Sequence, residues 1–318
     1  MFTVSRAITL SASLMSSDRP HSGAEAGEVD YRRRRLLAAL ALSSLLGGLP
    51  ALAALPQPRI VALEWLPLEM LLALGVKPLA AADPRDYAVW VKEPALPPGL
   101  INVGKRSAPN LEYIAELKPD LIIYSQGYGP RAAQLQDIAP VTEVAFTDQQ
   151  GQPLAKVRSE LLSLAERLGK TAEAHIHLNG FDRQLAAGYE QLTAWRRQPL
   201  LVFSLLDSRH AVILGNRSLF GNVMQKLGIE NAWQGEDSFW GTATVGIEQL
   251  ARLPAVRAIC LDHDDAALRS RLSLTPLWQA LPFVRENTLR IVPAIWLFGS
   301  TFAAARFCHM LQELDKKW

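Results

Sequence analysis

Aromatic side chains gather at predicted loops and strand ends of this chain rather than in the spaced stripes of buried helices. The set comprises Trp65, Trp90, Tyr124, Tyr128, Trp233, Trp240, Trp296 and Phe298. Several of them stand beside glycine, where a backbone bend exposes side chains, although each ring taken singly is also explained as core. Aromatic walls with few polar groups suit a bulky and largely uncharged ligand. Arg106 and Tyr128 would be the polar pair of such a pocket.

The sequence carries no recognisable catalytic motif. It contains no Gly-x-Ser-x-Gly, His-Glu-x-x-His or Gly-x-Gly-x-x-Gly segment. Gly99–Arg106 approaches a phosphate-binding loop, but Arg106 stands where a Ser or Thr would hold magnesium. Asp262–Asp265 offers metal-type ligands, yet adjacent side chains after a strand point in opposite directions, so we interpret this segment as an exposed loop. We therefore do not expect an enzyme.

Two stretches share one pattern and indicate two similarly built lobes. Glu112 and Glu248 each stand in the first turn of a short amphipathic helix. In both stretches a Leu follows five residues later, then a break marked by Pro, then an apolar run rich in strand formers. The two glutamates lie about one small domain apart, which favours a duplicated α/β architecture.

Strands and helices alternate on both sides of a purely helical region. The expected strands are 59–63, 79–82, 121–124, 141–145, 200–203, 211–214, 258–261 and 290–292. Such alternation predicts two Rossmann-like α/β lobes with mostly parallel sheets flanked by helices. In folds of this kind, ligands bind beyond the carboxyl ends of the strands, here in a cleft between the lobes.

The helical region supplies a candidate connection between the lobes. A helix expected from Thr171 to Arg197 would be roughly 40 Å long, enough to cross from one lobe to the other. We predict an N-terminal lobe over 54–168, a bridging helix over 169–198 and a C-terminal lobe over 199–318.

Residues 1–53 have the features of a signal peptide. Four consecutive arginines, Arg32–Arg35, precede a short apolar run and an Ala-x-Ala end at Ala51–Ala53. Cleavage is expected after Ala53 or Ala54. Export is expected by the twin-arginine route or by the Sec route. The segment before the arginines, residues 1–31, is unusually long for a signal peptide. This length indicates either an extended n-region or a start codon placed too early. No Cys stands at the end of the leader, directly after the apolar run, so we expect no lipid anchor there.

The charge of the exported chain limits the kinds of partner it can bind, and its cysteine content limits its disulfides. The leader holds six of the 33 basic and four of the 31 acidic residues, which leaves 27 of each. A neutral chain without basic clusters argues against nucleic acid and against an anionic membrane surface as the main partner. Cys260 and Cys308, in a predicted strand and a predicted helix face, read either as two core thiols or as a disulfide.

Six strings of the chain carry a resemblance to a known family. They are Arg59–Pro67, Pro109–Glu112, Gly127–Pro130, Asn231–Glu236, Phe239–Gly241 and Thr275–Ala280. With these strings the sequence resembles the periplasmic iron(III)-hydroxamate (ferrichrome) binding proteins of siderophore importers. The resemblance runs from about Arg59 to the closing helix.

This resemblance implies two lobes joined by one long helix, with a shallow cleft and little hinge closure. It implies that Arg106 and Tyr128 contact the iron–hydroxamate centre. The iron would keep its siderophore oxygens, so neither a metal ligand from the protein nor a cofactor is expected. It also implies that the aromatic wall of the pocket is formed by Trp65, Trp90, Trp233, Trp240 and Trp296. Two wall positions depart from the family pattern: Tyr124 stands where Trp is usual, and Phe298 replaces a Tyr.

The wider family of single-helix binding proteins implies a role for Glu112 and Glu248, namely docking onto arginines of an ABC importer permease in the inner membrane. A glutamate favoured by the dipole at a helix start explains either one alone. We expect a periplasmic monomer that delivers ferric hydroxamate siderophores. A haem or cobalamin carrier of the same fold is the first alternative, and a periplasmic hydrolase is the remote one.

Overall fold

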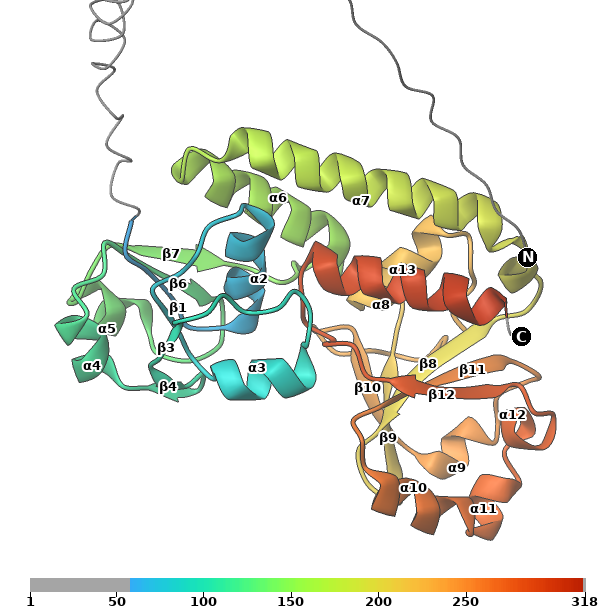
Figure 1. The fold of residues 1–318 in the computed structure, drawn as a ribbon. Coiled ribbons are helices and arrows are strands. Elements are labelled where there is room, and N and C mark those ends of the chain that lie inside the picture. Colours follow the sequence, from blue (N-terminus) through green and yellow to red (C-terminus); the bar gives the residue numbers. More distant parts are fainter. Residues whose placement is uncertain (1–57, 317–318) are drawn as a thin grey trace, which may run out of the picture. The chain divides into compact units, whose positions relative to one another are not determined.

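The computed structural model describes residues 58–316, in which the strands form two five-stranded sheets and one two-stranded hairpin (Figure 1). The expected leader and residues 54–57 lie outside the described residues. Within 58–316, no helix combines the length and the apolar character that crossing a membrane requires.

The N-terminal sheet is wholly parallel, as the alternation of strands and helices predicts. Its order is β3-β2-β1-β6-β7. The strands are β1 (Ile60–Ala62), β2 (Ala80–Ala81), β3 (Ile101–Asn102), β6 (Leu121–Ser125) and β7 (Val141–Val144). The order reverses between β1 and β6, so a crevice is expected beyond the carboxyl ends of these two strands.

Short helices and a hairpin complete this lobe. They are α2 (Trp65–Ala73), α3 (Pro84–Trp90), α4 (Leu111–Glu116) and α5 (Ala132–Gln136), with β4 (Gly104–Lys105) paired to β5 (Ala108–Pro109). The Asn110 side chain accepts a hydrogen bond from the backbone N–H of Tyr113, which caps α4.

The C-terminal sheet has the order β10-β9-β8-β11-β12 and is mixed. Its strands are β8 (Leu200–Leu205), β9 (His210–Leu214), β10 (Thr242–Gly246), β11 (Arg257–Asp262) and β12 (Leu289–Pro293). Strands β8, β11 and β12 are parallel, but β9 runs antiparallel to β8 and β10. The connection from Leu205 to His210 is too short for a parallel crossover, and Asp207 stabilises its turn by accepting backbone N–H bonds from Arg209 and His210.

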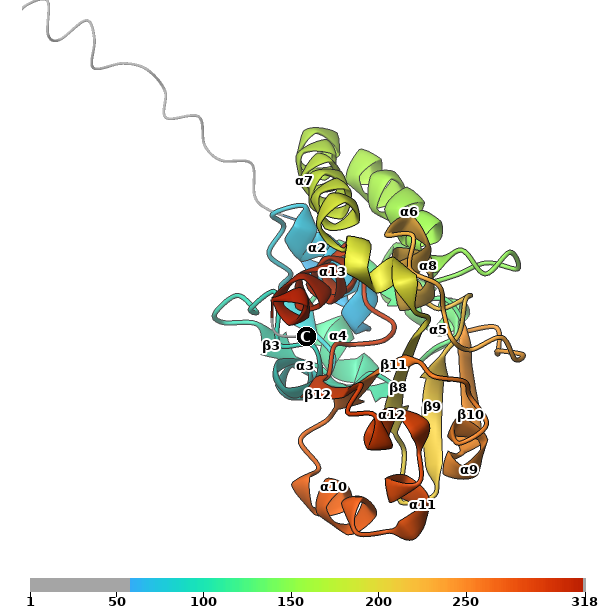
Figure 2. The same ribbon diagram turned by 90° about the vertical axis from the view of Figure 1, so that its right-hand side faces the viewer.

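Helices of very different length cover this second sheet. They are α8 (Leu219–Lys226), α9 (Ile247–Leu250), α10 (Ala266–Ser273), α11 (Pro276–Gln279), α12 (Pro282–Arg285) and α13 (Thr301–Asp315). Figure 2 shows α10, α11 and α12 grouped away from α8 and α13.

Two helices connect the sheets, α6 (Pro153–Arg167) and α7 (Thr171–Gln191), and a 3-10 turn over Thr193–Arg197 follows (Figure 1). The helix α7 packs against α2, α6 and α13. It ends at Gln191 rather than at Arg197, because the chain tightens into the 3-10 turn before Pro199. The bridging role of α7 alone and the three domain limits remain predictions.

The largest buried cluster joins the two sheets. It includes Ile60 and Ile123 from the first sheet, Val202 and Ile259 from the second, and apolar residues of α2, α6, α7, α8 and α13. Separate clusters lie under α9, α11 and α12 and under α4 and α5. Since the shared cluster is apolar and buried, moving the lobes apart would expose core to water.

Candidate ligand-binding site

Two polar side chains mark the point where the strand order of the first sheet reverses. Ser125 ends β6, and Glu64 follows β1 by two residues and caps the start of α2. The Glu64 carboxylate accepts hydrogen bonds from the backbone N–H of Leu66 at 2.6 Å and from Ser125 Oγ at 3.3 Å. An acidic residue between a strand and a helix is thus fixed as an N-cap and is aimed at the crevice.

Arg106 reaches the same place from the turn between β4 and β5. Its Nη1 lies 2.5 Å from Glu64 Oε1, and its backbone N–H donates to Asp83 Oδ2 at 2.8 Å. The guanidinium carbon lies 3.5 Å from the centre of the Trp65 ring, a cation–π contact. The side chain is only 14% exposed, and its Nε is buried without a hydrogen-bond partner. Arg106 is therefore held firmly before any ligand arrives.

A cavity of about 350 Å³ opens in front of this ion pair. The residues that line it are Glu64, Leu66, Arg106, Ser125, Gln126, Gly127, Tyr128, Phe146, Trp240, Trp296 and Phe298. Residues 64–146 of this lining belong to the N-terminal half, whereas Trp240, Trp296 and Phe298 come from the C-terminal half. The cavity thus lies between the lobes and brings together five of the nine predicted ligand-binding residues.

Phe298 meets three other rings of the cavity edge to face. The ring centres of Trp296 and Phe298 are 5.6 Å apart at an interplanar angle of 81°, and those of Trp240 and Phe298 are 6.1 Å apart at 73°. Phe146 adds a third contact to Phe298 at 5.5 Å. Tyr128 is 44% exposed, and its ring centre lies 5.4 Å from the Arg106 guanidinium carbon. The wall is apolar and its rings pack against one another, while the Tyr128 phenol and the Arg106 guanidinium both line the cavity.

Four predicted residues lie elsewhere. Tyr124 is buried in the cluster under α4 and α5, because neighbours on a strand alternate and Ser125 faces the cavity. Burial and Glu143 raise the pKa of Tyr124. Trp65 is 1% exposed and lies beneath Arg106 rather than in the lining. Trp233 packs on the C-terminal core, and its Nε1 donates to the Glu236 carbonyl.

Trp90 borders a neighbouring cavity of about 370 Å³ at the carboxyl ends of β8 and β11. Its ring centre lies 4.6 Å from that of His263, whose pKa is lowered by burial. Trp90 also contacts Trp296, with ring centres 6.5 Å apart, so it packs against a lining residue of the cavity between the lobes without lining that cavity itself.

The sequence-based prediction did not include six residues of the lining, namely Glu64, Leu66, Ser125, Gln126, Gly127 and Phe146. Glu64 stands directly between an apolar run and a helix, which is the available signal for an N-cap at a ligand crevice. Ser125 and Gln126 fill the gap between Tyr124 and the Gly127 turn. For residues 58–316, no group of three or more His, Cys, Asp or Glu side chains is placed to hold a metal ion.

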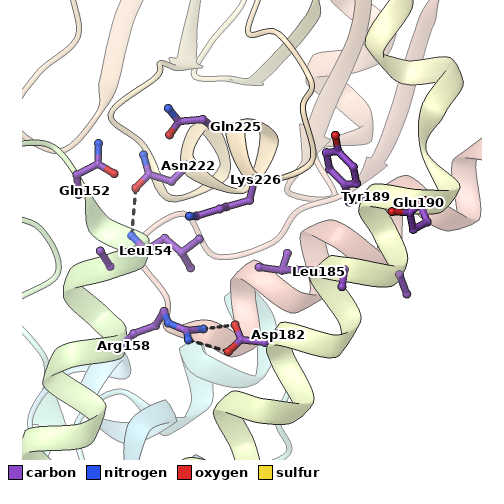
Figure 3. A pocket seen from close by; sticks show the side chains of 13 residues that line it. Gln152, Leu154, Arg158, Asp182, Leu185, Tyr189, Glu190, Asn222, Gln225 and Lys226 are labelled. Carbon is purple, nitrogen blue, oxygen red and sulfur yellow. Dashed lines mark hydrogen bonds and ion pairs between the residues drawn. The ribbon is translucent and has the colours of Figure 1, made fainter.

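A second cavity, of about 720 Å³, lies away from these residues between α6, α7 and α8 (Figure 3). At one end of it, Arg158 of α6 and Asp182 of α7 form a bidentate ion pair, with N–O distances of 2.6 and 2.9 Å. The Leu154 backbone N–H donates to the Asn222 side chain at its other end. It lacks the aromatic wall, and Arg158 and Asp182 are already paired with each other, while Glu190 and Lys226 complete its charged lining.

Two α/β lobes with a ligand-sized cavity between them are the architecture of a substrate-binding protein. Residues 60–295 match the model of the periplasmic binding protein family, and the chain belongs to that family. It is 43% identical over 283 residues to the iron(3+)-hydroxamate-binding protein FhuD of Escherichia coli, covering 88% of this chain and 95% of that protein. It is 28% identical to the Fe(3+) dicitrate-binding periplasmic protein FecB of E. coli, over 78% of this chain and 81% of that protein.

Solved structures agree with this assignment. The siderophore-binding protein FhuD of Vibrio cholerae, bound to Fe3+–Desferal, superimposes with a TM-score of 0.73 at 25% identity, covering 81% of this chain and 97% of that chain. FhuD2 of Staphylococcus aureus with bound ferrioxamine B shares the fold, with a TM-score of 0.67 at 18% identity over 82% of this chain and 98% of that chain. The chain is a binding protein rather than an enzyme.

Proposed function

We propose that this protein captures an iron(III)-hydroxamate siderophore of the ferrichrome type in the periplasm and delivers it to an ABC importer of the inner membrane. The observation that carries the proposal is the joint presentation of Arg106 and Tyr128 at an aromatic cavity between two lobes. The E. coli relative at 43% identity, named for iron(3+)-hydroxamate binding, supports this ligand class. So does the V. cholerae structure with bound Fe3+–Desferal.

The chemistry of the cavity suits such a ligand. Hydroxamate oxygens carry negative charge, so a guanidinium can donate charge-assisted hydrogen bonds to them, and a phenol adds one directional bond. The iron keeps its siderophore oxygens and is cargo, so the protein contributes neither a metal ligand nor a cofactor. The rings of Trp240, Trp296 and Phe298 would cover the apolar surface of the siderophore.

In this proposal, the predicted residues outside the lining hold the lining residues in place and do not contact the ligand. Trp65 supports the Arg106 guanidinium from below, and Trp90 supports Trp296 from behind. Tyr124 and Trp233 stabilise the strand and the loop next to the cavity from within the cores of the two lobes. Substituting them would change affinity through the positions of the lining residues rather than through lost ligand contacts.

Delivery to the importer is assigned to Glu112 and Glu248. Both side chains are exposed, each in the first turn of a short helix, α4 in one lobe and α9 in the other. A carboxylate at a fixed place on each lobe suits a permease that presents one arginine to each. The carrier would act as an exported monomer after loss of residues 1–53, with α7 as the link between its lobes.

A fluorescence titration tests the ligand class. The apo-protein without its leader is titrated with ferrichrome, coprogen, ferrioxamine B, haem and cobalamin, and quenching of the cavity tryptophans is recorded. We expect saturable quenching by the ferric hydroxamates. Saturable binding of haem or cobalamin together with no binding of any ferric hydroxamate would contradict the proposal.

A further inference from the structure

The charges that line the binding cavity cancel. Among the described residues of the lining, Arg106 is the one cation and Glu64 the one anion, and they form an ion pair with a 2.5 Å separation. A site for an anionic ligand would be expected to keep a cation without a partner. Here the single guanidinium is already neutralised by the protein.

Glu64 cannot turn away when a ligand enters. Its carboxylate also accepts the Leu66 backbone N–H at 2.6 Å and the Ser125 hydroxyl at 3.3 Å. The residue is 7% exposed and begins α2. Moving its side chain would leave a helix N-terminus and a buried serine without partners, which is costly.

A second carboxylate stands behind the guanidinium. Asp83 Oδ2 lies 3.9 Å from Arg106 Nε and accepts the backbone N–H of Arg106. Lys105 Nζ approaches Asp83 Oδ1 at 3.3 Å, but Lys105 is largely exposed and also pairs with Asp86. Water screens that lysine more strongly than the buried groups. Arg106 therefore lies between two acids, and its Nη2 is left to donate to a ligand.

We propose that Glu64 is a specificity-determining residue: by neutralising Arg106, it restricts the cavity to ferric complexes without net negative charge. The inference rests on the proposed function and adds a charge filter to it. Neutral trihydroxamates still gain a guanidinium donor and an aromatic wall. An anionic complex would lose its hydration shell and face a fixed carboxylate. Its dissociation constant should therefore rise by about tenfold for each negative charge.

The test keeps the iron centre constant and varies only the charge on the pendant arm. Ferrioxamine B carries one positive charge, its N-acetyl derivative none, and its N-succinyl derivative one negative charge. Dissociation constants are measured by fluorescence quenching for the wild type, Glu64→Gln and the exposed control Glu116→Gln. The glutamine introduced by Glu64→Gln would keep an oxygen for the Leu66 N–H, so the cap of α2 is retained.

In the wild type we expect affinity to fall from the cationic to the neutral to the anionic complex. In Glu64→Gln, the ratio of the succinyl to the acetyl dissociation constant should decrease by about tenfold. In Glu116→Gln it should stay at the wild-type value. A ratio unchanged in Glu64→Gln, or equal loss of affinity for all three complexes, would overturn the charge filter. Failure of the wild type to bind even the neutral complex would overturn the proposed function as well.

Discussion

Glu69 and Ser300 tie the two halves of the chain together at a fully buried point. Glu69 Oε2 accepts hydrogen bonds from the Ser300 backbone N–H at 2.7 Å and from its hydroxyl at 2.6 Å. Glu69 lies on α2, and Ser300 caps the start of α13 directly after the cavity residues Trp296 and Phe298. The pair thus anchors one wall of the binding cavity to the opposite lobe.

This pair should make stability depend on pH. Burial raises the pKa of Glu69 from 4.5 to about 7; Glu64 adds to the rise, whereas the Ser300 hydrogen bonds and Arg306 oppose it. Tyr87 also interacts electrostatically with Glu69, and burial raises the pKa of its phenol. Because the folded state binds the Glu69 proton more tightly than the unfolded state, the stabilisation is complete below about pH 4.5 and is lost as pH rises to about 7.

We predict that Glu69→Gln removes this pH dependence. Gln keeps an oxygen for both Ser300 donors and never ionises. The free energy of unfolding is measured in urea from about pH 4.5 to 8. Over this range, the value for the wild type should fall by about 3 kcal/mol relative to that for Glu69→Gln. The exposed Glu116→Gln should keep the wild-type slope. Parallel curves for the wild type and Glu69→Gln would contradict the prediction.

Replacing Arg106 by Ala should weaken ferrichrome binding by about 10- to 100-fold, the usual worth of a charge-assisted hydrogen bond. The same change leaves Glu64 buried without its cation and should lower the melting temperature. Fluorescence titration and thermal unfolding measure the two effects. The double variant Arg106→Gln/Glu64→Gln should regain stability while its affinity stays weak, which separates the ligand contact from the ion pair. If Arg106→Ala binds ferrichrome with the affinity of the wild type, Arg106 does not contact the ligand and the prediction is wrong.

The two cysteines are free and buried, Cys260 on β11 and Cys308 on α13, in different core clusters. Burial raises the pKa of Cys260 to about 12 and that of Cys308 to about 11. We therefore expect neither to react with a thiol reagent at about pH 8 in the folded protein and both to react after denaturation. A reductant should leave the melting temperature unchanged. Loss of both titratable thiols in the untreated, denatured protein would reveal a disulfide instead.

The positions of strands and helices follow from local pattern. The apolar runs expected at 59–63 and 200–203 form β1 (Ile60–Ala62) and β8 (Leu200–Leu205), since each is flanked by Pro or polar residues that end pairing. Strand direction is less local. The sheets are mostly parallel as expected, but β9 is antiparallel because the four residues between β8 and β9 permit only a hairpin, a constraint of length rather than of composition.

Membership of the cavity depends on tertiary placement. Tyr124 and Ser125 are neighbours, yet alternation along β6 sends the aromatic ring to the core and the hydroxyl to the cavity. Glu64 reads locally as a helix cap. Only the fold brings it to Arg106, 42 positions further along the chain. A sequence pattern identifies rings and charges able to bind, but the opposite lobe decides which of them face a ligand.

The duplicated glutamates lead to the last prediction. Replacing both Glu112 and Glu248 by Lys should abolish siderophore-dependent iron uptake, because each lobe would present a cation to the arginines expected on the permease. Ferrichrome affinity of the purified double variant should equal that of the wild type, since both glutamates are exposed on α4 and α9 and neither lines the cavity. Uptake of labelled iron and a fluorescence titration measure the two quantities.

The exposed Glu116 lies on the same helix as Glu112, so Glu116→Lys is a matched control that changes charge on α4 without touching the proposed docking positions. It should leave uptake unchanged. Each single variant, Glu112→Lys or Glu248→Lys, should reduce uptake in part, because one lobe still docks. Normal uptake in the double variant would contradict docking through these residues. A large loss of ligand affinity would place them in the binding site instead, although neither belongs to the cavity lining.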